Sequence, residues 1–134
     1  MSKLQTFTVP LYLTRGKAKK KNYWLTLSNY RNWKFHLNNS LKIQFKEEIK
    51  IDHLKPFVGK VRVTYTMYYP DFRLRDIDNS MAVLSKFTLD ALVEKGILED
   101  DNYENVIEIR GKLGGVEKAN AHCVVEIKEI DDDY

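Results

Sequence analysis

The sequence predicts a single α+β domain, built on one mixed or antiparallel sheet of about four to five strands with two main helices. Its length of 134 residues suits one domain. Segments with the alternation of β-strands are interspersed with segments that have helical periodicity. The composition, with 43% hydrophobic and 31% charged residues, is typical of a globular chain and not of a disordered one. We therefore expect residues 1–134 to form one domain.

The first half of the chain predicts a strand followed by a long helix. Residues 4–13 favour a strand that Pro10 pushes toward a sheet edge or a bulge. After a short apolar stretch at residues 23–27, Ser28 or Asn29 can cap a helix that runs to about Lys50. Its apolar residues recur every three or four positions, as one helical face requires: Tyr30, Trp33, Leu37, Leu41, Phe45 and Ile49.

The second half predicts a strand, a helix and a hairpin. Residues 60–69 alternate, with one set facing one way (Val61, Val63, Tyr65, Met67, Tyr69) and the residues between them facing the other. A second helix is expected from about Ser80 to Lys95, and Gly96 suits the position just after its end. Residues 105–113 and 121–130 predict two strands joined in a hairpin around Gly114-Gly115.

The charge is distributed unevenly. The net charge is only +3, but a basic loop at about residues 14–22 holds five cations: Arg15, Lys17, Lys19, Lys20 and Lys21. An acidic C-terminal tail at residues 131–134 offsets part of this positive charge in the sum. Such a loop attracts polyanions through counterion release, although a merely solvated loop is the simpler alternative.

Two further features indicate the compartment. No apolar run approaches the ~20 residues that span a bilayer, and the N-terminal residues lack the apolar core of a signal peptide. Cys123 is the only cysteine, so no intrachain disulfide can form. We expect a cytoplasmic protein without a membrane partner.

Carboxylates occur in two groups, at Arg75-Asp76-Ile77-Asp78-Asn79 and at Glu99-Asp100-Asp101. If residues 76–78 are extended, Asp76 and Asp78 project to the same side, and Asp101 can join them if its loop folds back. Converging carboxylates repel unless a cation lies among them, and Mg²⁺ prefers oxygen ligands with substrate phosphates. The pattern predicts a metal-dependent nuclease.

Simpler explanations compete with this hypothesis. Asp78 or Asn79 can act only as a helix cap. An EF-hand is excluded, because counting from Asp76 places Met81 and Phe87 where the calcium loop needs glycine and glutamate. A D-x-D nucleotide-sugar transferase normally needs a larger donor-binding domain. Tyr65, Tyr68 and Tyr69 favour sheet packing over base stacking, and the three histidines show no metal-ligand spacing.

Three segments together carry a family resemblance: residues 75–79, residues 86–92 (Lys-Phe-Thr-Leu-Asp-Ala-Leu) and residues 96–101 (Gly-Ile-Leu-Glu-Asp-Asp). In this order they resemble the pattern R-D-x-D-N, K-x-x-x-D-A-L and G-x-x-x-D-D of the RusA family of Holliday-junction resolvases. The close match covers about residues 70–105.

The resemblance implies a homodimeric, Mg²⁺-dependent endonuclease, with Mn²⁺ as a possible substitute, that resolves four-way DNA junctions by paired symmetric nicks. It makes Asp76, Asp78 and Asp101 the metal ligands, with Asp100 as the alternative to Asp101. Arg75 and Arg73 would contact DNA, together with the cations of the basic loop. Such enzymes are common in phages and prophages.

Two assignments stay open. The family lysine follows the second aspartate of D-x-D by four residues, where this chain has Ala82, whereas Lys86 follows Asp78 by eight. Lys86 becomes the catalytic lysine only if the start of the helix shifts; otherwise it is a surface residue. Its position four residues before Asp90 predicts an ion pair between the two. The alternative functions are an inert nucleic-acid-binding protein of the same fold, or a metal nuclease that acts on flaps, forks or RNA.

Overall fold

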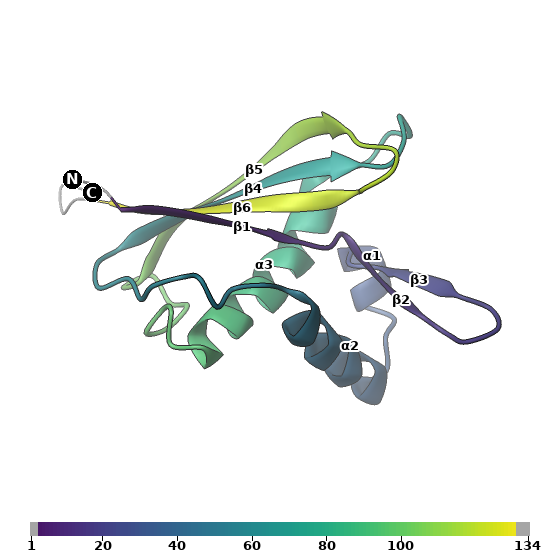
Figure 1. The fold of residues 1–134 in the computed structure, drawn as a ribbon, viewed down its shortest axis with the longest axis horizontal. Helices are drawn as coiled ribbons and strands as arrows, with labels where there is room; N and C mark the ends of the chain where they lie inside the picture. Colours follow the sequence, from purple (N-terminus) through teal and green to yellow (C-terminus); the bar gives the residue numbers. More distant parts are fainter. Residues whose placement is uncertain (1–2, 131–134) are drawn as a thin grey trace.

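The computed structural model describes residues 3–130, so the predicted acidic tail at residues 131–134 lies outside the described part. Within that part, no helix is both long and apolar enough to cross a membrane. The chain forms the predicted α+β fold, with one mixed sheet and a separate hairpin (Figure 1).

Four strands from residues 3–130 form the main sheet. In spatial order they are β1 (Leu4–Val9), β6 (His122–Glu129), β4 (Val61–Tyr69) and β5 (Val106–Val116). Strand β4 runs parallel to β5 and antiparallel to β6, and β6 runs antiparallel to β1. The parallel pair is joined through a helix, as a crossover connection requires.

Helices lie on one side of this sheet (Figure 1). They are α1 (Leu27–Tyr30), α2 (Phe35–Glu48) and α3 (Ile77–Glu94). The hairpin of β2 (Tyr12–Arg15) and β3 (Lys21–Trp24) projects away from the sheet beside α1.

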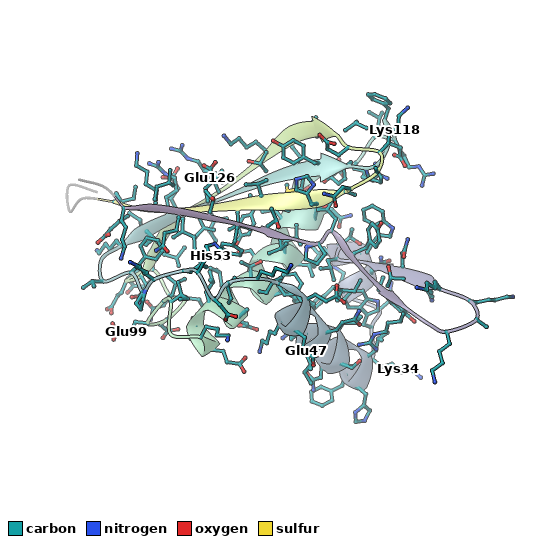
Figure 2. All side chains as sticks on the ribbon, in the orientation of Figure 1. Lys34, Glu47, His53, Glu99, Lys118 and Glu126 are labelled. Atoms are coloured by element: carbon teal, nitrogen blue, oxygen red, sulfur yellow. The ribbon has the colours of Figure 1, made fainter. Side chains whose placement is uncertain are left out.

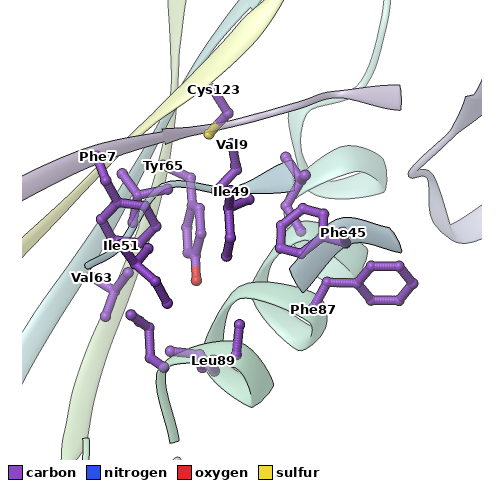
Figure 3. Packing of buried hydrophobic residues seen from close by; sticks show 14 of the residues in the cluster. Phe7, Val9, Phe45, Ile49, Ile51, Val63, Tyr65, Phe87, Leu89 and Cys123 are labelled. Atoms are coloured by element: carbon purple, nitrogen blue, oxygen red, sulfur yellow. The ribbon is translucent and has the colours of Figure 1, made fainter. Parts of the chain in front are cut away.

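The core fills the space between the sheet and the helices (Figure 3). The alternation predicted for residues 60–69 is present, because Val63, Tyr65 and Met67 are fully buried. The rings of Phe45 on α2 and Phe87 on α3 meet edge to face, with centroids 5.5 Å apart. Burying each such side chain contributes about 1.5–3 kcal/mol, so this packing holds α2 and α3 against the sheet.

The predicted strand at residues 4–13 is divided by Pro10. Residues before it form β1 at a sheet edge, and residues after it form β2 in the separate hairpin. Proline has no N–H to continue the ladder. The edge position of the strand before Pro10 was predicted, while the change of sheet after it was not.

The predicted helix from about residue 28 to 50 is divided as well. Thr26 caps α1, and α2 begins only at Phe35. The side-chain amide of Asn32 donates a 3.0 Å hydrogen bond to the carbonyl of Ser28, the group that the backbone N–H of Asn32 would use in a continuous helix. This competition explains a break that the apolar spacing conceals.

The predicted hairpin around Gly114-Gly115 is wrong. Strands β5 and β6 do not pair, because β4 lies between them. The chain turns later, at residues 117–121. A Cβ at Gly114 would lie 2.5 Å from the ring of Tyr68, so this glycine allows a close approach and does not form a turn.

Helix α3 begins earlier than predicted. Its N-cap is Asp76, whose backbone is extended, and the first helical residue is Ile77 instead of Ser80. Gly96 follows the helix with a positive φ of 77°, as predicted for the residue after its end. The earlier start places Asp78 inside the first turn.

Candidate functional site

Asp76 and Asp78 lie at the N-terminus of α3, and both side chains are exposed. Neither carboxylate has a hydrogen-bond or ion-pair partner among residues 3–130. The extended geometry expected for residues 76–78 is not formed, because Asp78 is helical, and residues two apart on a helix do not face each other. The positive end of the helix dipole stabilises carboxylates here, so Asp78 has a structural role available without any metal.

Arg75 is fixed by its surroundings. Its Nη1 donates a 2.8 Å hydrogen bond to Asp71, and its guanidinium lies over the rings of Trp24 and Tyr69, 5.2 and 4.9 Å from their centroids. The side chain is only 18% exposed. Arg75 therefore joins the segment before α3 to β3 and β4, and little of it remains free for a phosphate.

A polar hollow of about 470 Å³ lies in front of the N-terminus of α3. Asp76, Arg73 and Arg75 line one side of it, and Trp24 and Ser28 line the other. The backbone N–H of Ser28 donates a 3.2 Å hydrogen bond to the side-chain oxygen of Asn79, which links the two sides. The side chain of Arg73 is exposed at this hollow.

The predicted basic loop forms the tip of the β2–β3 hairpin. Four of its cations are exposed on the hairpin: Lys17, Lys19, Lys20 and Lys21. The fifth, Arg15, donates to Gln44 Oε1 at 2.6 Å and to Ser40 Oγ at 2.9 Å, which ties the hairpin to α2. Because Trp24 ends β3 and lines the polar hollow, this basic hairpin leads directly to Asp76.

Asp101 lies at the other end of the molecule. It follows α3, whose 18 residues extend about 27 Å, and it precedes β5, which begins beside Val61 at the start of β4. Asp76 instead follows the end of β4. Figure 2 shows the same separation, with Glu99 of the Asp101 loop far from Lys118 beyond the end of β5. The expected return of this loop to the start of α3 is not seen.

The geometry distinguishes Asp101 from Asp100. The carboxylate of Asp100 accepts hydrogen bonds from the backbone N–H of Asp101 at 2.7 Å and from the side chain of Asn102 at 3.2 Å. The carboxylate of Asp101 has no such partner in the described part of the chain. Asp100 thus stabilises its own loop, and the carboxylate of Asp101 is the one that remains available to bind a metal.

No three acidic, histidine or cysteine side chains among residues 3–130 lie close enough together to hold a metal. Mg²⁺ needs fewer protein ligands than that, since one or two carboxylates often suffice beside substrate phosphates. An exposed carboxylate without a partner, such as that of Asp76 or of Asp78, suits that smaller set. The third predicted ligand, Asp101, is not within reach of it in the same chain.

Lys86 lies in the middle of α3 and is exposed. The helix is continuous from Ile77, so the shift that would bring Lys86 to the start of α3 is absent, and the two residues Asp78 and Lys86 are separated by about 12 Å along the axis. Its expected pairing with Asp90 is wrong, because Asp90 pairs with Lys42 of α2 at 3.7 Å.

Two of the three tyrosines considered for base stacking are inaccessible. Tyr65 is fully buried, and Tyr69 is buried with its hydroxyl 3.1 Å from Ser80 Oγ. Tyr68 is on the opposite face of the sheet, where its ring stacks on His122 with centroids 4.8 Å apart.

Cys123 is buried in the core. Burial raises the pKa of the Cys123 thiol to about 12, which keeps it protonated.

Sequence reasoning missed the contacts across the polar hollow and a second, separate basic surface. The contacts of Trp24 and Asn79 across the polar hollow join segments distant in sequence, so no local signal reveals them. A second hollow of about 540 Å³ lies on the face of the sheet opposite the helices and carries Arg62, Arg110, Lys112 and Lys128. The strand alternation placed Arg62 on that outer face, and the same alternation of Arg110 and Lys112 was available to predict this basic surface.

No model of a known protein family matches the chain, and no curated protein matches it either.

Proposed function

We propose that the protein is a Mg²⁺-dependent, structure-selective DNA endonuclease that resolves four-way junctions by paired symmetric nicks, as the resemblance to the RusA family implies. The observation that carries the proposal is the basic hairpin that leads to a polar hollow edged by Asp76. A basic arm beside free carboxylates suits a phosphodiester substrate, because the cations bind the DNA backbone and the carboxylates remain available for metal. The enzyme would act in the cytoplasm of a bacterial or phage-infected cell.

The roles of the residues follow from their surroundings. The four exposed lysines of the hairpin and Arg73 bind phosphates, while Arg75 and Arg15 position the segments that carry them. Asp76 and Asp78 hold Mg²⁺, with Mn²⁺ as a substitute. When bound, the metal would activate a water and neutralise charge on the scissile phosphate.

Asp101 enters the site only in a homodimer. Its position at the far end of α3 keeps it from Asp76 of the same chain. A two-fold axis that sets the two copies antiparallel brings Asp101 of each copy to the Asp76 and Asp78 of the other. Paired nicking of a junction needs two such sites related by a two-fold axis, so one dimer would satisfy both requirements.

One observation favours the alternative, an inert nucleic-acid-binding protein of the same fold. The carboxylates within one chain are divided between the two ends of α3, and a chain that remains monomeric would have no complete site. Such a protein would keep the basic hairpin and bind DNA without cutting it.

Cleavage of matched DNA substrates separates these functions. A four-way junction, a fork and a linear duplex with the same sequence arms are incubated with the protein, with Mg²⁺ or with a chelator. The proposal predicts paired nicks in the junction that require Mg²⁺. Binding of the junction without nicks would establish the inert alternative. Preferential cutting of the fork would show that the preferred substrate is another branched DNA.

A further inference from the structure

We propose that two copies of the chain join through antiparallel pairing of their β5 strands, so that β5 is the interface of the homodimer. The proposal rests on the proposed function for the role of the interface in DNA cleavage. The experiments that test the interface itself do not depend on cleavage. It follows from the edge of the sheet, the exposed apolar side chains beside it and the position of Asp101.

Strand β5 is a long edge. It has 11 residues, pairs with β4 on one side, and has no strand on its other side in the described chain. The opposite edge, β1, is partly covered, because Gln5 exchanges two hydrogen bonds with the backbone of Lys55 and the ring of His53 lies 3.0 Å from the carbonyl of Thr6. An uncovered edge presents unpaired backbone groups to another chain, so β5 is the better template for pairing.

Apolar side chains accompany this edge. Ile109 and Leu113 pair in register with the buried Val63 and Met67 and thus share the helix side of the sheet, yet they are 42% and 60% exposed. Leu113 also lines a hollow of about 190 Å³ together with Phe72 and Leu74, two side chains that are 80% and 96% exposed. Exposed apolar side chains that gather at one edge of a sheet indicate an interaction surface.

A second copy fits this edge because the edge is self-complementary. Ile109 and Leu113 flank Gly111, which lets Ile77 and Met81 of α3 approach closely. A two-fold axis beside Gly111 sets each Ile109 opposite the partner's Leu113, and such cross-strand apolar pairs stabilise the pairing of two strands.

The same register has an electrostatic cost on the other face of the sheet. There Arg110 lies opposite the partner's Lys112. Within the chain, Arg110 already pairs with Glu108 at 2.6 Å, which offsets part of the repulsion. Salt screens the remaining repulsion: the Debye length is about 18 Å at ~0.03 M salt and about 6 Å at ~0.3 M salt. The dimer should therefore be tighter at the higher salt concentration.

The pairing also unites the divided carboxylates. Antiparallel β5 strands place the beginning of one strand, which follows Asp101, beside the end of the other, which adjoins the segment before Asp76. This is the arrangement that the proposed metal site requires. A partner of another kind would leave Asp101 unused.

Sedimentation velocity at micromolar concentration tests the interface with a matched control. Leu113→Lys should convert the wild-type dimer to a monomer, whereas Leu4→Lys on the other edge, at a residue of similar 57% exposure, should leave the dimer intact. Circular dichroism monitors folding. A monomeric wild type, or a folded Leu113→Lys variant that remains a dimer, would overturn the proposal.

Disulfide trapping tests the register even if Leu113→Lys does not fold. Arg110→Cys and Lys112→Cys variants are mixed and oxidised; Cys123 is buried and does not compete. Directly opposed residues have Cα atoms about 4.5–5.5 Å apart, within disulfide range, so the mixture should cross-link while each variant alone should not. No cross-link in the mixture would refute this pairing. Neither experiment uses cleavage, so a protein that dimerises through β5 without cutting DNA would refute the proposed function alone.

Discussion

The Nη1 atom of Arg75 donates a 2.8 Å hydrogen bond to the carboxylate of Asp71. This bond, with a second one from the backbone of Arg73, holds the pKa of Asp71 below its usual range. A group whose pKa is lowered by folding adds stability above its unfolded pKa of about 3.9, and that stability is lost as the pH falls through the folded pKa.

We therefore predict that Arg75→Ala raises the pKa of Asp71 toward its ordinary value. NMR titration of the side-chain carboxyl measures it directly. The melting temperature of Asp71→Asn should lie below that of the wild type at pH 7, and the difference should shrink toward pH 2. An unchanged Asp71 pKa in Arg75→Ala would contradict the assigned role of the Arg75 bond.

The basic hairpin should carry much of the DNA affinity. Replacement of Lys17, Lys19, Lys20 and Lys21 by Ala should weaken junction binding and flatten its salt dependence, since each phosphate contact contributes about 0.9 to the slope of log K against log salt. The control removes the same charge from four exposed lysines elsewhere: Lys50, Lys55, Lys60 and Lys118. Equal salt slopes for both quadruple variants would show that DNA binds elsewhere.

Tyr65 provides a test of the core. Its hydroxyl is buried near Ser85 but makes no hydrogen bond of good geometry with any other group of residues 3–130, and burial raises the pKa of Tyr65. Tyr65→Phe removes an unpaired polar group, so the free energy of unfolding should stay equal or rise by up to about 1 kcal/mol. Tyr69→Phe is the matched control. It loses a bond to Ser80 and should be destabilised by about 1–2 kcal/mol. A loss above about 1 kcal/mol in Tyr65→Phe would mean that the hydroxyl has a partner.

Asp78→Asn should separate binding from chemistry. The substitution keeps the shape of the side chain but removes a negative charge from the proposed metal site, so cleavage should fall at least about 100-fold, which corresponds to ~2.7 kcal/mol. Junction affinity in a chelator should hold or rise, because less negative charge faces the phosphates. Glu47→Gln, at an exposed carboxylate on α2, controls for the loss of charge. Normal cleavage by Asp78→Asn would show that Asp78 does not bind the metal and only interacts with the dipole of α3.

Features that depend on local spacing were predicted well. The alternation of residues 60–69 identified the buried face of β4 because strand periodicity reports directly on which side is covered. Gly96 marked the end of α3 because few other residues adopt its backbone conformation. The basic segment at residues 15–21 was located correctly, although its hairpin was not foreseen.

Features decided by long-range pairing were not predictable from the sequence. Gly114-Gly115 has the composition of a turn, but its first glycine only makes room for the ring of Tyr68. The return of Asp101 toward Asp76 was plausible as long as the length and straightness of α3 were unknown. An uninterrupted helix of 18 residues rules it out within one chain.

Complementation between two inactive variants tests the central claim most directly. Asp78→Asn and Asp101→Asn chains are co-expressed with different affinity tags, and heterodimers are isolated through both tags. If each site takes Asp78 from one chain and the partner's Asp101, one site carries both substitutions and the other carries neither. We predict Mg²⁺-dependent nicking of the four-way junction at about half the wild-type rate per dimer, with single nicks in place of paired cuts. A heterodimer as inactive as the two variant homodimers would contradict the shared site, and failure to capture any heterodimer would contradict the dimer itself.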